Sequence, residues 1–501
     1  MSKGIYDRFA DNVQHTPSKV AVVFMKQSVT YRELNQQVLK LESHFLKNGM
    51  REGQRVALFA PNGIEFVVAL LAVAKLGFAV VPLPVSLKGQ ALITALKKTP
   101  VTMVIAWPTI SKVILKANII ASQNVITLGQ KVADEPTWED IQLSNEKYAI
   151  KNTIDLNAPF IITMTSGSTG QPKPIILSQA CKINRAYNAT INRYNLTSQD
   201  VILVATPMYH SLAQRGVLMP LMLGSTSIIL PKFNLKHWLD AVETYRVSFL
   251  FAVSAQLESL VKYGVGDSNL DSLKCVVSSS AVLEELTKKK LLSLLPCRFH
   301  ECYGASEVGV VTDFAVSEKP EQSGSVGQAL SFVSLKIMDN KGRELAHNEI
   351  GEICCKTSTL FNGYLEMQAQ TKNAFYLDGF FRTGDLGYID TEAFLYYVGR
   401  KKEIISSGGI NVFPQDIETV VKSIEGIAEC VAFGVNDDTL GEVIKLIYEQ
   451  SSEQSLEKDI RKVCLSELTD YQQPRFLERV LSLPRNAMGK VLRNDAKRQY
   501  S

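Results

Sequence analysis

The stretch FVVALLAVAKLGFAVVPLPV, residues 66–85, decides the fold class of this chain of 501 residues. It is apolar enough to suggest a membrane span, but Lys75 interrupts it, and Gly77 and Pro82 break it. A membrane-crossing helix needs about 20 mostly apolar residues without such breaks, so a buried helix followed by a buried strand explains the stretch better. We therefore predict no membrane span, and helices and strands that alternate along the chain.

The same alternation continues over the first four-fifths of the chain. Short apolar runs predict buried strands, among them VAVVF (20–24), RVALFA (55–60), FIITMT (160–165), VILVAT (201–206) and FLFAV (249–253). Between them lie amphipathic segments such as TYRELNQQVLKLESHFLKNG (30–49), in which Thr30 and Glu33 have the spacing of a capping box. This pattern predicts a large α/β domain of mainly parallel sheets flanked by helices.

The pattern changes near YYVGRKKEIISSGG (396–409), where a smaller set of strands and helices begins. About a hundred residues remain, which suits one small α+β domain. We therefore predict a large N-terminal domain over residues 1–400, a hinge near Lys402, and a small C-terminal domain over residues 403–501.

Composition excludes several classes of protein. The chain is 46% hydrophobic and carries a net charge of only +4, so it predicts neither a disordered protein nor a nucleic-acid binder. Its first residues show no secretory signal, and none of its eight cysteines forms a C-x-x-C pair. We expect reduced core cysteines and a cytoplasmic location.

The loop TSGSTGQPK (165–173) follows a predicted buried strand and has the composition of an anion site. Glycines let backbone N–H groups converge on an anion, hydroxyls add donors, and Lys173 adds positive charge. It is not the common P-loop, which needs Gly-Lys-Ser/Thr. The loop therefore predicts phosphate binding, by Thr165, Ser166, Gly167, Ser168, Thr169, Gly170 and Lys173.

Four further blocks follow this loop in a characteristic order. They read ECYGASEVG (301–309), FFRTGDLGYID (380–390), VGRKKEIISSGGINVFPQDIE (398–418) and LPRNAMGKVLRNDAK (483–497). Together with the loop, they resemble the adenylate-forming (AMP-binding) superfamily, most closely its acyl-CoA synthetases, which are carboxylate–CoA ligases. The resemblance covers nearly the whole chain.

The resemblance implies ATP, Mg²⁺ and CoA as cofactors, and it implies roles for particular residues. Lys490 would be the catalytic lysine, Glu307 would hold Mg²⁺, and His210 would lie at the wall of the acid pocket. Lys402 would be the hinge, and Gly408 and Gly409 would border the CoA tunnel. Besides the phosphate loop, the nucleotide would be bound by Ser279, Ser280, Ala281, Cys302, Tyr303, Gly304, Ala305, Ser306, Asp385 and Arg400.

The chain departs from the family pattern at several positions. Ser279 and Ser280 stand where the family has two glycines, so they bring side chains close to the adenine or the acid. Pro174, Gln179 and Asn486 are further departures. None of them removes a charge that the mechanism requires.

The residues after His210 bear on the acid. No acidic residue occurs from Val201 through Leu239, and an unpaired ammonium in an apolar pocket is costly, so an amino-acid substrate is disfavoured. The neighbouring segments GVLMPLMLG and FLFAVSAQL favour an apolar acid, aliphatic or aryl.

The predicted function is ATP- and Mg²⁺-dependent activation of an apolar carboxylic acid to an acyl-adenylate, followed by thioester formation with CoA. An alternative is an adenylating enzyme that loads the pantetheine of a separate acyl-carrier protein. A nucleotide-binding protein without catalysis, or a luciferase-like oxygenase, remains an alternative of a different class.

Overall fold

Residues 66–85 form a helix and a strand, as predicted. Helix α3 (Ile64–Leu76) is buried along its length apart from Glu65 and Lys75. It ends at Gly77, whose φ of +68° lies in the left-handed region that favours glycine, and β4 (Ala79–Pro82) follows. Within the residues that the structure describes, no helix is both long enough and apolar enough to span a membrane.

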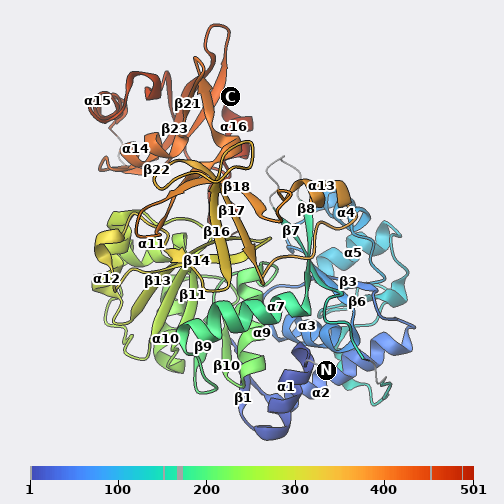
Figure 1. Cartoon of the computed structure of the whole chain (residues 1–501). Coiled ribbons are helices and arrows are strands. Elements are labelled where there is room, and N and C mark those ends of the chain that lie inside the picture. The colour runs from blue at the N-terminus through green and yellow to red at the C-terminus, as the bar shows by residue number, and fades with distance from the viewer. Residues whose placement is uncertain (1–2, 150–152, 166–172, 452–453, 488) are drawn as a thin grey trace. The chain divides into compact units, whose positions relative to one another are not determined.

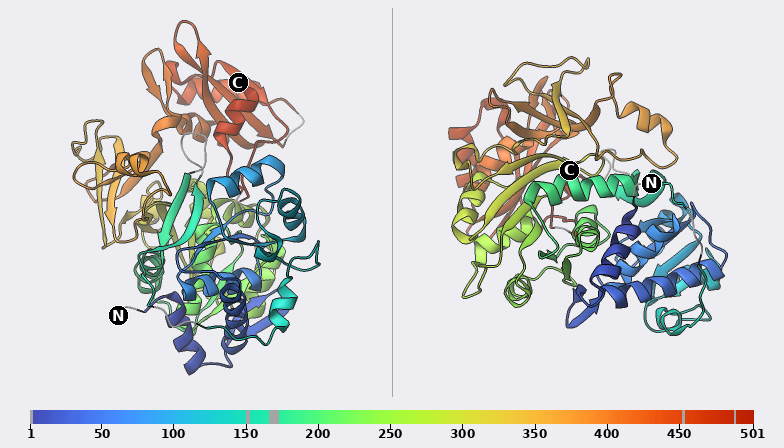
Figure 2. Two further views of the ribbon diagram at one scale, coloured as in Figure 1. Left: turned by 90° about the vertical axis from the view of Figure 1, so that its right-hand side faces the viewer. Right: turned by 60° about the horizontal axis from the view of Figure 1, so that its bottom comes forward.

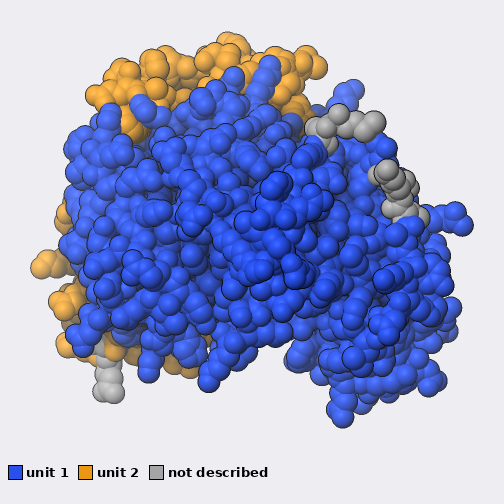
Figure 3. Space-filling model, turned by 90° about the horizontal axis from the view of Figure 1, so that it is seen from below, with its two compact units in different colours: residues 1–167, 171–334, 356–373 blue, residues 168–170, 335–355, 374–501 orange. Residues whose placement is uncertain are grey.

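The computed structural model describes residues 3–149, 153–165, 173–451, 454–487 and 489–501. The chain forms two units, which Figure 3 colours separately. Unit 1 comprises residues 1–167, 171–334 and 356–373, and unit 2 comprises residues 168–170, 335–355 and 374–501. The boundary near Lys402 remains a prediction.

Unit 1 contains a six-stranded sheet with the order β6-β5-β3-β4-β7-β8. Its pairs are parallel except for β7–β8, which is antiparallel. The strands are β3 (Arg55–Phe59), β4, β5 (Met103–Ala106), β6 (Val125–Thr127), β7 (Pro159–Thr165) and β8 (Lys173–Ser178). The connecting helices α3, α4 (Gly89–Lys98) and α5 (Pro108–Lys116) make this a succession of strand–helix–strand units.

Unit 1 also contains a nine-stranded sheet with the order β15-β14-β13-β12-β11-β9-β10-β1-β2 (Figure 1). Its central strands are parallel, and β2, β14 and β15 pair antiparallel at the two ends. The strands are β1 (Val20–Phe24), β2 (Gln27–Thr30), β9 (Val201–Val204), β10 (Thr226–Ile229), β11 (Phe249–Val253), β12 (Cys275–Ser279), β13 (Arg298–Ala305), β14 (Gly309–Ala315) and β15 (Gln328–Ala329). The connecting helices are α9 (Ser211–Leu223), α10 (Leu235–Tyr245), α11 (Ser254–Tyr263) and α12 (Glu285–Leu294).

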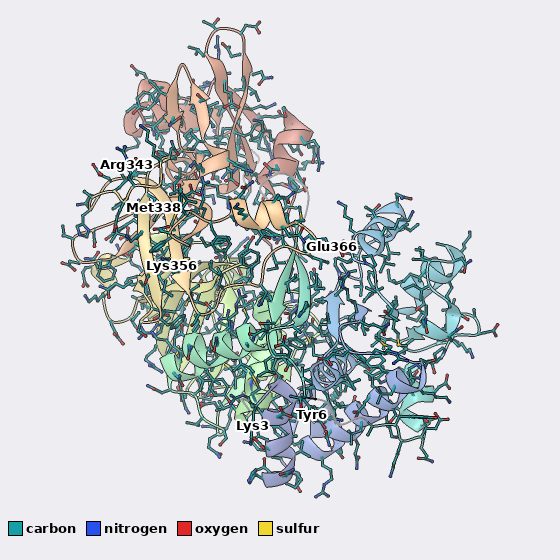
Figure 4. All side chains as sticks on the ribbon, turned by 45° about the vertical axis from the view of Figure 1, so that its right-hand side comes forward. Lys3, Tyr6, Met338, Arg343, Lys356 and Glu366 are labelled. Carbon is teal, nitrogen blue, oxygen red and sulfur yellow. The ribbon has the colours of Figure 1, made fainter. Side chains whose placement is uncertain are left out.

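The N-terminal helices α1 (Ile5–His15) and α2 (Tyr31–Lys47) pack with α3 (Figures 1 and 2). Tyr6, labelled in Figure 4, joins all three, because its hydroxyl donates to Asn35 Oδ1 at 2.8 Å and Lys75 Nζ lies 5.3 Å from its ring centroid. The capping box predicted for residues 30–49 is present. Thr30 N donates to Glu33 Oε2 at 2.8 Å, and Glu33 N donates to Thr30 Oγ1 at 3.3 Å.

Most strands of unit 2 belong to two sheets. One has the order β16-β17-β18-β19 and is formed by β16 (Val333–Met338), β17 (Gly351–Thr357), β18 (Phe381–Ile389) and β19 (Leu395–Arg400). The other has the order β21-β20-β23-β22, with β24 on β23, and is formed by β20 (Ile405–Ser407), β21 (Ile410–Val412), β22 (Ile427–Asp437), β23 (Gly441–Gln450) and β24 (Phe476–Arg479). The second sheet packs with α14 (Pro414–Lys422), α15 (Glu457–Glu467) and α16 (Arg493–Tyr500), an α+β arrangement as predicted.

The cysteines are free and most of them lie in the core. All eight are free, and all but Cys297 are buried. Free, mostly buried cysteines agree with the prediction of reduced core residues.

Candidate active site

The predicted phosphate loop connects two neighbouring strand ends. Strand β7 ends at Thr165 and β8 begins at Lys173, and these two residues are opposite each other in the antiparallel pair. The two residues that flank the loop therefore lie at the same end of the β7–β8 pair. Ser166, Gly167, Ser168, Thr169 and Gly170, which were predicted to bind phosphate, lie outside the described residues.

Tyr364 connects Lys173 with Glu307. Lys173 Nζ lies 4.9 Å from the centroid of the Tyr364 ring, a cation–π distance. The Tyr364 hydroxyl donates to Glu307 Oε1 at 3.1 Å. Burial raises the pKa of Tyr364, and the negative charge of Glu307 raises it further, so the hydroxyl stays protonated and continues to donate. The predicted phosphate lysine and the predicted metal carboxylate therefore meet on one aromatic ring.

The turn that carries Glu307 is held through its backbone. The Glu307 carbonyl accepts from Phe361 N at 2.7 Å and from Arg185 Nη2 at 3.0 Å. The same Nη2 also donates to the Ser306 carbonyl at 3.0 Å, and Arg185 Nε donates to the Thr359 carbonyl at 2.9 Å. Arg185 is 1% exposed, so a buried guanidinium holds this turn against residues 359–361.

The carboxylate of Glu307 fits a magnesium ion that arrives with a nucleotide. Glu307 is partly exposed, and no group of three His, Cys, Asp or Glu residues suited to a metal occurs among the described residues. Mg²⁺ is usually bound by one or two carboxylates together with phosphate oxygens and water. Glu307 would therefore supply the protein ligand, and the nucleotide would supply others.

The block 302–306 forms the end of β13 and the following turn. Here β13 and β14 approach closely, and a Cβ added to Gly304 would lie 1.9 Å from the Gly309 carbonyl oxygen. Gly304 is therefore required by the backbone itself. Cys302 and Tyr303 are buried, whereas Gly304 and Ser306 are exposed and Ala305 is intermediate. The Cys302 thiol contacts Tyr194 Oη and Asp313 Oδ1, each at 3.3 Å, so its side chain belongs to the core.

Ser279, Ser280 and Ala281 follow β12. Ser280 has a φ of +86°, a conformation that L-residues rarely adopt, and it stands at one of the family's glycine positions. The Ala281 carbonyl accepts from Ser254 Oγ at 2.7 Å. Leu283 N donates at 2.8 Å to Glu301, a buried carboxylate that pairs with Lys288. Hydrogen bonds thus hold the segment that directly follows the exposed Ser280.

His210 precedes the first residue of α9. Its ring packs against Tyr209 with a centroid distance of 4.3 Å. Burial lowers the pKa of His210 to about 4, so the imidazole is neutral at pH 7. A neutral imidazole can donate one hydrogen bond to a carboxylate, which suits the predicted position at the acid pocket.

Within unit 2, three of the predicted residues lie together. Asp385 on β18 and Arg400 on β19 are opposite each other, with Arg400 Nε 3.3 Å from Asp385 Oδ1. Lys490 follows a tight turn in which Lys490 N donates to Asn486 Oδ1 at 3.0 Å. Lys490 is exposed as a residue, but partial desolvation of its ammonium lowers its pKa, as does Arg400, while Glu403 and Asp385 oppose this effect. The residues predicted to bind ribose, Asp385 and Arg400, are thus close enough to the predicted catalytic Lys490 to influence its charge.

The hinge and tunnel residues are exposed. Lys402 lies in a short 3-10 turn (Lys401–Glu403) between β19 and β20. Gly408 and Gly409 form the two-residue turn between β20 and β21, with φ values of +57° and +79°. Two successive positive φ values define a type I′ hairpin turn, which requires residues such as glycine. The hairpin by itself therefore accounts for both glycines, and their role at a CoA tunnel remains a prediction.

Four residues of this region were not predicted. Tyr364 and Arg185 lie outside the quoted blocks and are placed by tertiary contacts. Arg215 lies between Val201 and Leu239, a range without acidic residues, and Lys182 lies on α7 (Gln179–Ala186). Only the spatial arrangement shows that these cations are buried.

Comparison with known families matches both parts of the chain. The model described as AMP-binding enzyme matches residues 9–365, and the model described as AMP-binding enzyme C-terminal domain matches residues 416–490.

Known proteins match the chain over nearly its whole length. Indoleacetate–CoA ligase of Aromatoleum aromaticum is 28% identical over 488 residues, covering 96% of this chain and 95% of that protein. 2-Succinylbenzoate–CoA ligase of Bacillus pumilus is 28% identical over 492 residues, with the same coverage. The fatty acid–[acyl-carrier-protein] ligase ScoC of Streptomyces coeruleorubidus is 25% identical over 505 residues, covering 98% and 95%. The structure of ATP-bound MatB from Rhodopseudomonas palustris superposes with a TM-score of 0.91 at 26% identity, covering 99% of both chains.

Proposed function

Because this chain belongs to the AMP-binding enzyme family, we propose that it activates a carboxylic acid with ATP and transfers the acyl group to CoA. In the first half-reaction, a carboxylate oxygen bonds to the α-phosphorus and pyrophosphate leaves. In the second, the thiol sulfur bonds to the acyl carbon and AMP leaves. The enzyme is an acid–thiol ligase of the AMP-forming class.

The observation that carries this proposal is the meeting of Lys173 and Glu307 on Tyr364. A carboxylate and a triphosphate repel each other, so their reaction requires positive charge that is in place beforehand. Lys173 stands at the end of the phosphate loop and supplies part of that charge. Mg²⁺, bound with the nucleotide, would neutralise charge on the phosphates. Glu307, oriented by Tyr364 and by the Arg185 contacts to its backbone, would hold that ion.

The residues of unit 2 suit the other end of the nucleotide. Asp385 accepts from donors such as ribose hydroxyls, and Arg400 beside it can donate to ribose or phosphate. Lys490, in the same electrostatic environment, would bridge the substrate carboxylate and the α-phosphate while the bond forms. We expect the C-terminal domain to rotate about Lys402 before the thiol attacks.

We further propose that the body of the acid is apolar, aliphatic or aryl. Helix α9 and strand β11, the segments predicted to line the pocket, are rich in buried aliphatic and aromatic side chains. The acids named for the CoA-ligase relatives, indoleacetate and 2-succinylbenzoate, both contain an aromatic ring.

A second candidate keeps adenylation but transfers the acyl group to the pantetheine of a separate acyl-carrier protein. One relative, the ScoC ligase, is named for that acceptor and matches nearly the whole chain. The two candidates differ only in the second half-reaction.

The test measures exchange of labelled pyrophosphate into ATP with linear acids of graded length and with aryl acids. We expect exchange with some apolar acids, its loss when Mg²⁺ is removed, and AMP formation that depends on CoA. If pantetheinylated carrier protein but not CoA supports AMP formation, the second candidate replaces the first. If no acid supports exchange, both are excluded.

A further inference from the structure

Among the residues that the structure describes, two buried basic side chains near His210 have no acidic partner. Lys182 on α7 is 4% exposed, and Arg215 on α9 is 7% exposed. Lys182 Nζ contacts neutral oxygens, at 3.4 Å from Ser211 Oγ and 3.2 Å from Gln214 Oε1. Over the described part of the chain, no carboxylate forms an ion pair with either cation.

Arg215 is the less satisfied of the two. Its guanidinium carbon lies 5.3 Å from the centroid of the Phe251 ring on β11, and its Nη1 is buried with no hydrogen-bond partner among the described residues. Burial lowers the pKa of Arg215 to about 10, and the charge of Arg185 acts in the same direction. Arg215 therefore remains charged at pH 7, without a counter-ion in the part of the chain that the structure describes.

The nearby Arg185 provides an internal contrast. It is also buried, but its guanidinium donates to the carbonyls of Thr359, Ser306 and Glu307 and so holds the turn that carries the Glu307 carboxylate. These hydrogen bonds explain why a charged Arg185 is buried. Among the described residues, Arg215 has no comparable set of hydrogen bonds.

Burial of an unpaired charge is strongly unfavourable, and apolar residues of similar volume are often as good or better for stability. Burial likewise lowers the pKa of Lys182 well below its ordinary value, an effect that Arg185 and Arg215 increase. Packing alone thus favours apolar residues at both positions. A ligand that brings negative charge would make the burial of these two basic side chains favourable.

The position of the pair indicates which ligand this is. Arg215 lies on α9, which begins directly after His210, and it faces Phe251 on β11. These are the two segments predicted to line the acid pocket.

We propose that Arg215 and Lys182 form a binding site for a second anionic group on the acid, so that the preferred substrate is a dicarboxylic acid with an apolar body. One carboxylate is adenylated and the other pairs with the two cations. This inference rests on the proposed function and specifies its substrate class.

The experiment compares matched acids in the pyrophosphate exchange assay. The pairs are hexanoate and hexanedioate, octanoate and octanedioate, and benzoate and terephthalate. For the best pair, we expect the wild-type kcat/KM to be about 100-fold higher for the dicarboxylate, because a site with buried charges rejects a ligand that leaves them unpaired. Arg215→Met and Lys182→Met should abolish the preference while retaining activity on monocarboxylates. Arg215→Lys should retain part of it.

The control is Lys262→Met, which removes an exposed lysine on α11 and should leave the preference unchanged. Thermal unfolding provides a readout apart from turnover. The preferred dicarboxylate should raise the Tm of the wild type and not that of Arg215→Met. Because Met removes an unpaired buried charge, the variant is expected to fold, and its own Tm reports this directly.

The outcomes separate the two proposals. Exchange with monocarboxylates but no preference for dicarboxylates would overturn this inference and leave the proposed function standing. A preference that persists in Arg215→Met and Lys182→Met would also overturn it. No exchange with any acid would remove the proposed function, and this inference with it.

Discussion

At the scale of a residue, the single side chain of Tyr364 joins two predicted site residues. Its ring contacts Lys173, and its hydroxyl donates to Glu307, so two groups far apart in sequence share one support. No motif that carried the family resemblance includes it. We interpret Tyr364 as a positioning residue for the metal and phosphate region.

Replacing Tyr364 with Phe keeps the ring beside Lys173 and removes the hydrogen bond to Glu307. A hydrogen bond to a charged group contributes about 1.5–3 kcal/mol, so the Mg²⁺ concentration for half-maximal exchange should rise roughly tenfold or more. The measurement is pyrophosphate exchange as a function of Mg²⁺. Tyr263→Phe, at an exposed tyrosine, serves as control, and an unchanged Mg²⁺ dependence in Tyr364→Phe would contradict the assignment.

Lys490 should act in only one half-reaction. Lys490→Ala is expected to slow adenylation by roughly 10² to 10³, by analogy with the removal of other groups that stabilise charge in a transition state. Transfer from preformed acyl-adenylate to CoA should be much less affected. Single-turnover measurement of each half-reaction decides this, with Arg498→Ala at an exposed position of α16 as control. Equal losses in both steps would argue against the role.

At the scale of elements, most strands of the two parallel sheets follow from their apolar runs. Strands β21 and β24 and helix α16 were not predicted. In the sheet β16-β17-β18-β19, the run EICCK (352–356) and the strand that ends at the Gly-Arg-Lys-Lys turn were predicted, whereas β16 and β18 were not. Strand β16 is only partly buried, with residues such as Ser334 exposed between apolar ones, so its pattern is weak. The short β21 exists because the type I′ turn at 408–409 brings it against β20.

That turn allows its structural and functional roles to be separated. Asparagine also adopts positive φ, so Gly409→Asn should preserve the β20–β21 hairpin while adding a side chain. If the turn borders the CoA tunnel, thioester formation should slow roughly tenfold or more while adenylation is unchanged, because close approach of backbone to pantetheine is lost. Gly379→Asn, at another positive-φ glycine, is the control. Unchanged thioester formation would assign the glycines to the hairpin alone.

At the scale of the whole molecule, the free energy of unfolding of unit 1 should depend on pH because of Asp313. This buried carboxylate pairs with Arg193 and accepts from Tyr194 Oη at 2.7 Å, and His300 Nδ1 lies 3.0 Å away. Burial would raise the pKa of Asp313, but the hydrogen bonds and nearby positive charge outweigh it and lower the pKa from 3.8 to about 2. Because the pKa of Asp313 is lower in the folded than in the unfolded protein, ionised Asp313 stabilises the fold at pH values above its unfolded pKa. This stabilisation is lost as the pH falls through the folded pKa.

The expected contribution is about 2 kcal/mol, present above about pH 4 and lost as the pH falls towards 2. Asp313→Asn should lower the free energy of unfolding by at least this amount at pH 7. It should also reduce the pH dependence below about pH 4. Denaturant unfolding at several pH values tests this, with Asp240→Asn at an exposed position as control. A pH dependence identical to that of the wild type would contradict the role of Asp313.

The sequence by itself determined the α/β class, the family and the order of the charged residues along the chain. Periodicity and family motifs are local properties, so residues 66–85 and the loop 165–173 could be interpreted without a structure. The predicted fold class and family are confirmed, whereas the domain boundary and the roles of the site residues remain predictions. Only the tertiary structure decided that Tyr364 joins Lys173 to Glu307, and that Arg215 and Lys182 are buried with no acidic partner among the described residues. Burial and partners depend on segments far apart in the chain, and no local pattern records which side chains meet.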